Sequence, residues 1–200
     1  MSINANDVKT LRDATGAGMM ECKKALQEAD GDLEKAKDLL RERGLASAKK
    51  FADRAADEGM VYAYLHRPAP EMPAKVGVMI ELNCATDFVA KTEAFQRIAH
   101  EIALHISFAN PSYLTRDEVP ADVVEREKEI YAKQAEGKPE QVVDKIVAGK
   151  LEAFYADNCL MDQKYIRDDS KTISQLLDEA TAELKEPVRV RRFSYFRVGV

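Results

Sequence analysis

The order of hydrophobic patterns along the chain constrains its fold more than any other feature of the sequence. Apolar residues follow helical spacing through the first 45 residues, then alternate over 60–66 and 76–82. Helical spacing returns from 88 to 185, and alternation closes the chain at 188–198. Strands that come first and last around a block of helices favour a small antiparallel sheet covered by helices. The sequence therefore predicts an α+β fold.

The amino-terminal pattern predicts three short helices with tight loops. Each of the three periodic segments is closed by a glycine, at Gly16, Gly31 and Gly44. The stretch from Leu45 to Glu58 is helical in composition and ends before Gly59, which indicates a stiff connection. We expect three parts: a three-helix docking domain at 1–45, a linker helix at 46–59 and a core α+β domain at 60–200.

Composition excludes several classes of protein. With 46% apolar residues, a chain of 200 residues can fill a packed core. The 30 basic residues are outnumbered by 35 acidic ones, for a net charge of −5, which argues against direct binding to nucleic acid. No run of about 18 apolar residues occurs, so we expect no membrane segment. Without a leader-like amino terminus, the chain is expected in the cytoplasm.

Cysteines and histidines give no sign of an enzyme. Cys22, Cys84 and Cys159 are far apart and form no CxxC pair, which predicts neither a disulfide framework nor a zinc site. His100 and His105 are five residues apart, about 140° around a helix, whereas zinc ligands at i and i+4 share a face. Phosphate-loop, GxSxG and GxGxxG motifs are missing from the sequence. We therefore predict no catalytic activity, no cofactor and no metal.

Met19 and Met20 allow two interpretations. Methionines commonly fill cores with flexible thioether side chains. However, this pair directly follows the Gly16-Ala17-Gly18 turn, and we expect one of the two to be buried and the other exposed. An exposed methionine beside Lys23 suits adaptable docking onto a partner helix.

Residues 83–91 (NCATDFVAK) lie where the second strand meets a long helix. One interpretation is structural: Thr86 or Asp87 caps the helix, and Phe88 packs at its start as a hydrophobic staple. The other interpretation requires Phe88 to point outward. A rigid corner between strand and helix would then present an aromatic ring and a carboxylate to the pocket of a partner.

Four segments resemble the bacterial translation elongation factor Ts family. The two longer ones are residues 15–26 (TGAGMMECKKAL) and residues 81–90 (ELNCATDFVA), in the order that the family shows. The shorter ones are residues 170–173 (SKTI) and 190–193 (VRRF). The resemblance runs from about Asp7 to the carboxyl end.

This resemblance implies a guanine nucleotide exchange factor for the GTPase elongation factor Tu. It implies an amino-terminal three-helix domain of the ubiquitin-associated type whose helices contact the GTPase, and we expect Met19, Met20 and Lys23 to make this contact. It also implies that Thr86, Asp87, Phe88 and Val89 displace magnesium from the GTPase, and that His105 touches the partner.

The resemblance further implies a short form of the family, with a single core half and no coiled-coil insertion. Short members are expected to pair through the core sheet. A three-stranded sheet with unpaired edges and an aromatic last strand (Phe193, Tyr195, Phe196) gives a physical reason for a homodimer. The alternative function is an adaptor that binds helical or ubiquitin-like ligands through the amino-terminal domain.

Overall fold

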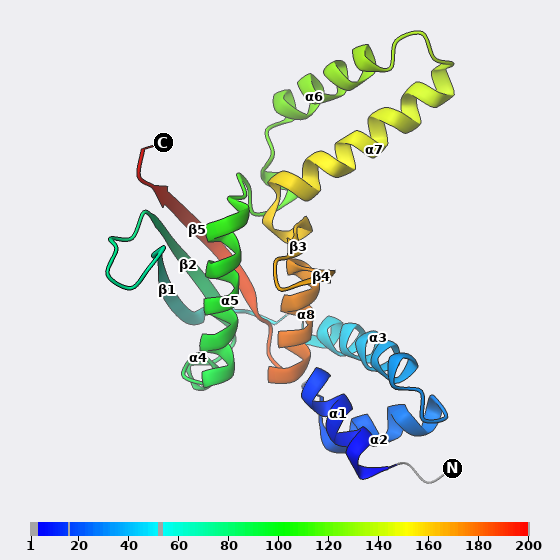
Figure 1. Cartoon of the computed structure of the whole chain (residues 1–200), viewed down its shortest axis with the longest axis vertical. Coiled ribbons are helices and arrows are strands. Elements are labelled where there is room, and N and C mark those ends of the chain that lie inside the picture. The colour runs from blue at the N-terminus through cyan, green and yellow to red at the C-terminus, as the bar shows by residue number, and fades with distance from the viewer. Residues whose placement is uncertain (1–3, 16, 52–53, 200) are drawn as a thin grey trace. The chain divides into compact units, whose positions relative to one another are not determined.

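The computed structural model describes residues 4–15, 17–51 and 54–199 (Figure 1). It divides into two compact units, each built from several stretches of the chain. The first unit comprises Met1–Gly59, Asn83–Phe95 and Leu177–Arg189, and the second comprises Met60–Leu82, Gln96–Leu176 and Val190–Val200. None of the helices within the described ranges is both long and apolar enough to cross a membrane.

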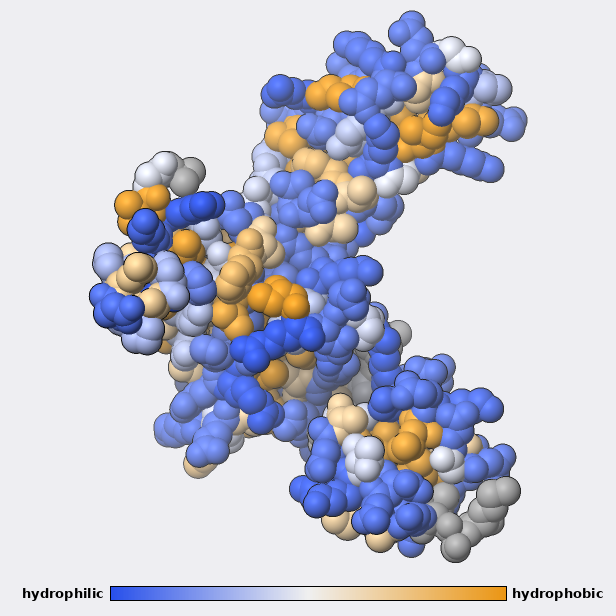
Figure 2. Space-filling view, in the orientation of Figure 1, coloured by the Kyte–Doolittle hydropathy of each residue, from blue (hydrophilic) through white to orange (hydrophobic). Residues whose placement is uncertain are grey.

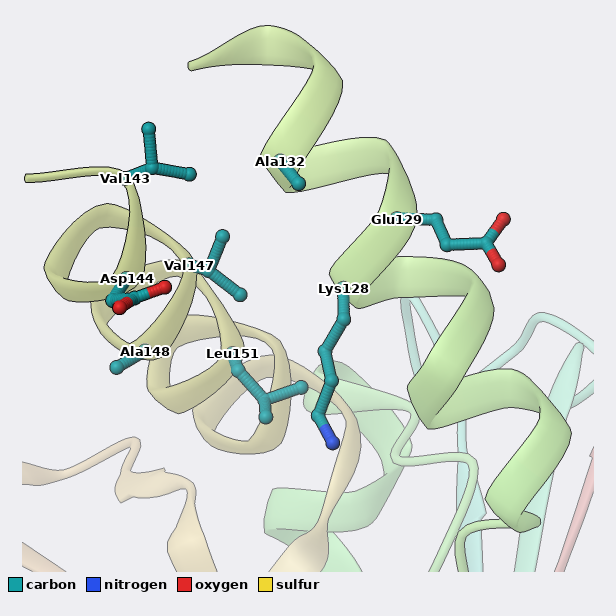
Figure 3. A pocket seen from close by; sticks show the side chains of 8 residues that line it. All are labelled: Lys128, Glu129, Ala132, Val143, Asp144, Val147, Ala148 and Leu151. Atoms are coloured by element: carbon teal, nitrogen blue, oxygen red, sulfur yellow. The ribbon is translucent and has the colours of Figure 1, made fainter. Parts of the chain in front are cut away.

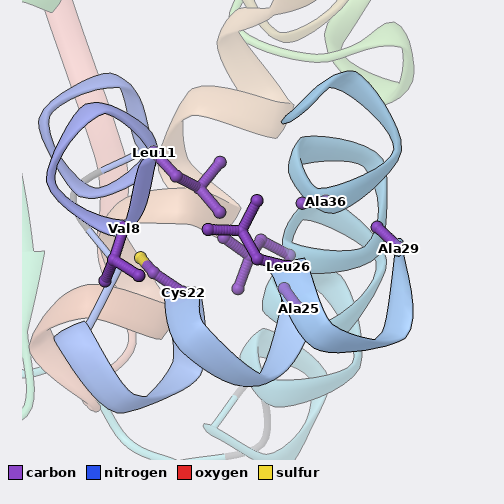
Figure 4. Packing of buried hydrophobic residues seen from close by; sticks show 8 residues of the cluster. Val8, Leu11, Cys22, Ala25, Leu26, Ala29 and Ala36 are labelled. Atoms are coloured by element: carbon purple, nitrogen blue, oxygen red, sulfur yellow. The ribbon is translucent and has the colours of Figure 1, made fainter. Parts of the chain in front are cut away.

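The first unit begins with three helices, α1 (Ala5–Thr15), α2 (Met19–Glu28) and α3 (Leu33–Phe51). Leu11 of α1 and Leu26 of α2 are fully buried and point into the space between the helices, beside Ala36 of α3 (Figure 4). Asp32 caps α3, since its Oδ1 accepts from the Lys35 amide at 3.1 Å. The predicted three-helix bundle is present, although Gly16, its expected first stop, lies outside the described residues.

The sequence predicts that the third helix ends at Gly44, but in the structure this helix continues beyond it. Helix α3 continues through Gly44 to Phe51, and its inward face carries Leu40 and Ala48 on either side of the glycine. A helix tolerates an internal glycine at a cost of about 1 kcal/mol when its apolar face continues to pack. The expected separate helix over 45–58 is therefore the end of α3. Residues 52–53 lie outside the described part, and the first strand already begins at Glu58.

The sheet has three strands, β1 (Glu58–His66), β2 (Val76–Cys84) and β5 (Arg189–Arg197), with β2 in the centre. The Val198 amide donates to the Lys75 carbonyl at 2.9 Å, and Arg192 Nε donates to Glu81 Oε2 at 2.6 Å. As the residue number increases along β5, the number of the residue that it contacts in β2 decreases, so the two strands are antiparallel. This confirms the predicted α+β class with a small antiparallel sheet.

One face of this sheet is covered by the helix α5 (Glu93–Ala109). Tyr62 and Tyr64 of β1 both set their rings edge-on against His100, with centroids 6.0 and 5.5 Å away. The alternate residues of each strand therefore point to the opposite face. Large apolar side chains remain exposed there: Val61, Leu65, Met79 and Phe196.

The helix expected from Phe88 to Phe108 is broken in two. A single turn, α4 (Asp87–Ala90), is followed by α5, which starts at Glu93. Thr92 makes the break, because its hydroxyl donates to the Val89 carbonyl at 2.8 Å and accepts from the Phe95 amide at 3.2 Å. Periodicity runs through such a break, because a capping threonine interrupts the backbone without changing the apolar spacing.

A helical hairpin is formed in the second unit by α6 (Ala121–Gln134) and α7 (Glu140–Asn158) (Figure 1). The sequence analysis predicts both helices separately but does not predict that they pair as a hairpin. Apolar side chains show at the hairpin surface (Figure 2), and Val147 and Leu151 of α7 line a shallow groove opposite Ala132 of α6 (Figure 3). Neither helix carries a buried residue of its own. The sequence does contain both helices, and only their arrangement was missed.

The second unit also contains small elements around the base of the hairpin. They are the 3₁₀ turns η1 (Arg116–Glu118) and η2 (Leu160–Asp162), and the antiparallel pair β3 (Lys164–Tyr165) and β4 (Asp168–Thr172). Arg116 ties these parts together, since its guanidinium contacts Glu152 at 2.8 Å and Asp162 at 2.7 Å. The pair β3–β4 was not predicted, because β4 is polar and has no alternation. Helix α8 (Ile173–Leu184) and β5 complete the chain.

Candidate partner-binding site

A tight corner joins the end of β2 to α4, and it carries the most exposed large aromatic side chain among the described residues. Phe88, in the first turn of α4, has 79% of its surface exposed. A staple residue would be covered by its own helix and the preceding chain. The structural interpretation therefore fails for Phe88, whereas it holds for Thr86, which is the N-cap of α4.

Thr86 is held at each of its polar atoms. Its amide donates to Glu186 Oε2 at 3.0 Å, and its hydroxyl donates to Glu186 Oε1 at 2.7 Å. Its carbonyl accepts a hydrogen bond from the Cys84 thiol at 3.1 Å. Its hydroxyl oxygen also accepts from the Val89 amide at 3.4 Å, which closes the cap. The corner is thus fixed from three directions within the first unit.

Cys84 is a structural thiol rather than a nucleophile. Its side chain is fully buried at the end of β2. Burial raises the pKa of Cys84, backbone hydrogen bonding at Thr86 lowers it, and the nearby charge of Glu186 raises it further. A protonated thiol is the form that can donate to the carbonyl. The raised pKa therefore favours the hydrogen bond that supports the corner, and disfavours thiolate chemistry.

Asp87 sits beside Phe88 and forms an ion pair along α4. Lys91 Nζ lies 2.5 Å from Asp87 Oδ2, and the hydrogen bond from Lys91 is the main cause that lowers the pKa of Asp87. The same ammonium lies 5.9 Å from the centre of the Phe88 ring. Asp87 is therefore ionised at neutral pH and solvent-accessible, next to an exposed ring.

Val89 and the start of α5 anchor the far side of the corner. Val89 is half-buried, and Thr92 bonds to its carbonyl. Three residues beyond Thr92, Phe95 is fully buried. Phe88 is thus the exposed member of a short segment whose two ends are fixed in the core.

The residues predicted for amino-terminal docking lie at the start of α2. Met19 is 57% exposed and Met20 is 65% exposed, so the expectation that one of them is buried is wrong. The inward face of α2 is already supplied by Cys22, Ala25 and Leu26. Lys23 is exposed as well, so all three predicted side chains are accessible.

His105 lies elsewhere, in the interior of the second unit. Only 1% of its surface is exposed, and its Nε2 lies 2.9 Å from Gln163 Oε1. Its Nδ1 is buried and has no hydrogen-bond partner among the residues that the structure describes. The partner contact that the resemblance implies for His105 would require this ring to be uncovered. The other histidine of the pair, His100, faces the sheet and pairs with Tyr62 at 2.9 Å.

Burial of His105 predicts a loss of stability in mild acid. Burial lowers the pKa of this imidazole, while the hydrogen bond to Gln163 opposes the change. Below the ordinary pKa of about 6.5 the unfolded chain therefore binds a proton that the folded protein does not. We expect the free energy of unfolding to decrease as the pH falls from 7 to 5.5, and to decrease less in His105→Gln.

Urea unfolding at several pH values measures this dependence. Carboxyl groups do not interfere, because those with a lowered pKa, such as Asp168, lose their contribution only in stronger acid. A wild-type midpoint that stays constant over this range, or an equal decrease in His105→Gln, would contradict the assignment.

No pattern in the sequence indicates the role of Glu186. It follows α8 and lies 100 positions from Thr86, yet its carboxylate accepts hydrogen bonds from both the amide and the hydroxyl of Thr86. No local pattern marks a residue that acts on so distant a partner, and a glutamate near a helix end is ordinarily a solvated side chain.

None of the described residues forms a group of three or more metal-ligating side chains. The corner and the start of α2 instead carry exposed apolar and charged side chains, which suit contact with another protein. Phe88 has the properties of an anchor residue, since it is large, aromatic and accessible on a fixed backbone.

Comparison with known proteins places these features in one family. The family model for elongation factor Ts matches residues 8–200. Elongation factor Ts of Thermoanaerobacter sp. (strain X514) is 53% identical over 199 residues, which cover 98% of this chain and 95% of that protein. Elongation factor Ts of Coprothermobacter proteolyticus is 53% identical, with both chains covered in full. Elongation factor Ts of Geobacter metallireducens is 51% identical over this whole chain and 91% of its own length.

Proposed function

Because the chain belongs to the elongation factor Ts family, we propose that it is a guanine nucleotide exchange factor for elongation factor Tu. It makes and breaks no covalent bond, and it needs no cofactor or metal of its own. This role lies in peptide-chain elongation and places the protein in the cytoplasm.

The proposed activity follows from thermodynamic linkage. A protein that binds the nucleotide-free GTPase more tightly than the GDP-bound form must weaken GDP binding by the same factor. Magnesium bridges the phosphates of a bound nucleotide and neutralises their charge. An anchor that displaces the groups around this ion therefore raises the rate of GDP release without any catalytic residue.

The exposed ring of Phe88 on its fixed corner is the observation that carries this mechanism. Thr86 fixes the backbone, Phe88 enters a pocket of the GTPase beside the nucleotide, and Asp87 brings a negative charge toward the magnesium site. Val89 stabilises the turn, because it is half-buried and its carbonyl accepts a hydrogen bond from Thr92. The adaptor alternative uses only the three-helix bundle. It therefore gives no reason for an exposed aromatic residue on a rigid backbone outside that bundle.

The direct test is the release of fluorescent GDP from elongation factor Tu. We expect the full-length protein to accelerate release in proportion to its concentration until the GTPase is saturated. The adaptor alternative is distinguished by capture of the GTPase in the presence of GDP and magnesium. An exchange factor loses its partner under those conditions, whereas an adaptor keeps its ligand.

The amino-terminal bundle is proposed as the second contact, through Met19, Met20 and Lys23. In the variant Met19→Ser/Met20→Ser, we expect the concentration for half-maximal exchange to rise about tenfold, as for the loss of a modest hot spot. The maximal rate should stay the same, because the corner is unchanged. Folding should be preserved, since both side chains are exposed.

Titration of exchange rate against protein concentration separates these two effects. Lys9→Ser, on the exposed surface of α1, is the matched control and should behave like the wild type. An unchanged half-maximal concentration in the methionine variant would show that this surface does not dock.

We also propose that two copies pair through the open face of the sheet. Helix α5 covers the other face, while this one exposes Val61, Leu65, Met79 and Phe196. Sheets with apolar faces pack against each other, and a two-fold axis lets the same face serve both copies. Exposed apolar side chains on one face of a sheet are a feature of protein–protein contact sites.

A further inference from the structure

We propose that Glu186 is a positioning residue for nucleotide exchange, which aims the exposed Phe88 by fixing Thr86. This inference rests on the proposed function and adds a residue to its site. Glu186 itself is half-buried behind the corner, so it acts through Thr86 rather than by touching the partner.

The contact between Glu186 and Thr86 has the geometry of a clamp. Both carboxylate oxygens are used, one on the Thr86 amide at 3.0 Å and the other on its hydroxyl at 2.7 Å. Hydrogen bonds to an ionised acceptor are shorter and stronger than neutral ones. Two such bonds from one carboxylate fix both the backbone and the side-chain rotamer of Thr86.

The segment that carries Glu186 is itself immobilised. Lys185 before it adopts a left-handed backbone conformation, with φ of 57°, and Pro187 after it is fully buried. The Val188 amide donates to the hydroxyl of Thr181 in α8 at 3.1 Å. Glu186 is therefore held on a fixed turn at the end of α8, and it passes this rigidity to the corner.

The clamp acts two residues before Phe88. Thr86 is the N-cap of a helix of four residues, so the direction of that helix depends on the conformation of Thr86. A group whose supporting contacts are lost moves by fractions of an ångström, which is enough to weaken a well-fitted contact. Loss of Glu186 should therefore misdirect Phe88 while leaving it exposed.

The first experiment measures GDP release from elongation factor Tu with the variant Glu186→Ala. We expect the maximal rate to decrease about tenfold, with little change in the half-maximal concentration, because the amino-terminal bundle still docks. Glu186→Gln keeps one strong acceptor and should recover part of the rate. Glu34→Gln, which removes an exposed carboxylate on α3 in the same unit, is the control for charge and should match the wild type.

A double-variant cycle separates positioning from a general loss of stability. If Glu186 acts by aiming Phe88, then Glu186→Ala should have little further effect in a Phe88→Ala background. Amide hydrogen exchange at residues 86–89 of the free protein should become faster in Glu186→Ala, at a temperature well below melting. That readout does not depend on the GTPase.

The outcomes are distinct. If the wild-type protein accelerates GDP release and Glu186→Ala does so equally well, the positioning role is wrong. An additive effect in the Phe88→Ala background, or unchanged hydrogen exchange at the corner, would likewise overturn it. A wild-type protein that does not accelerate GDP release overturns the proposed function, and the role of Glu186 with it.

Discussion

Replacing Phe88 with alanine should reduce the acceleration of GDP release by about 30-fold, which corresponds to the loss of an anchor worth about 2 kcal/mol. The ring is 79% exposed, so it contributes little to the core of its own protein. We therefore expect the melting temperature to change little, as for other exposed substitutions. Exchange should suffer more than binding, because Met19 and Met20 remain available to dock.

Phe108→Ala is the matched control for this variant. Phe108 is also a largely exposed phenylalanine, at 60%, but it belongs to α5 and contacts His66, with ring centroids 4.9 Å apart. We expect it to support exchange at the wild-type rate. Stopped-flow release of fluorescent GDP measures both variants. Normal acceleration by Phe88→Ala would refute the corner as the functional centre, and a large loss of melting temperature would assign Phe88 a structural role.

Replacing Met79 with aspartate should separate the proposed dimer into monomers. Met79 lies on β2, the central strand, and points to the face that α5 does not cover. In a two-fold interface one substitution places a carboxylate on each of the two copies, where each would lose water without a partner. We expect the dissociation constant of the dimer to rise at least about 100-fold, which is about 2.7 kcal/mol.

Met72→Asp provides the control, because Met72 and Met79 are both 50% exposed. Met72 lies in the loop between β1 and β2, away from the strands. It should leave the dimer intact. Sedimentation equilibrium at micromolar concentrations measures all three proteins. A monomeric wild type would contradict the homodimer, and a Met79→Asp protein that dimerises normally would move the interface away from this face.

Most helices and the main sheet follow from local periodicity. The alternation in β1, β2 and β5 reflects one face packed on α5, which the sequence records as every second residue. Two helix boundaries were predicted wrongly, for reasons opposite to each other. Gly44 looks like a stop but continues a packed helix, whereas Thr92 interrupts the backbone without changing the apolar spacing.

The sequence allowed Phe88 to point either outward or into the protein, and it could not decide between the two. An aromatic residue at a helix start is buried only if other residues cover it. Those residues can be far away along the chain. The strand pair β3–β4 escaped prediction because polar strands carry no hydrophobic period. Glu186 escaped it because a contact across 100 positions leaves no local trace.

The fixed corner also bears on how fast the complex can form. Segments that fold on binding lose conformational entropy at the moment of encounter, which reduces affinity. Thr86 is already held at its amide, hydroxyl and carbonyl in the free protein, so no loop has to become ordered when a partner arrives. Association should therefore resemble rigid docking, with no ordering step at the corner before the complex forms.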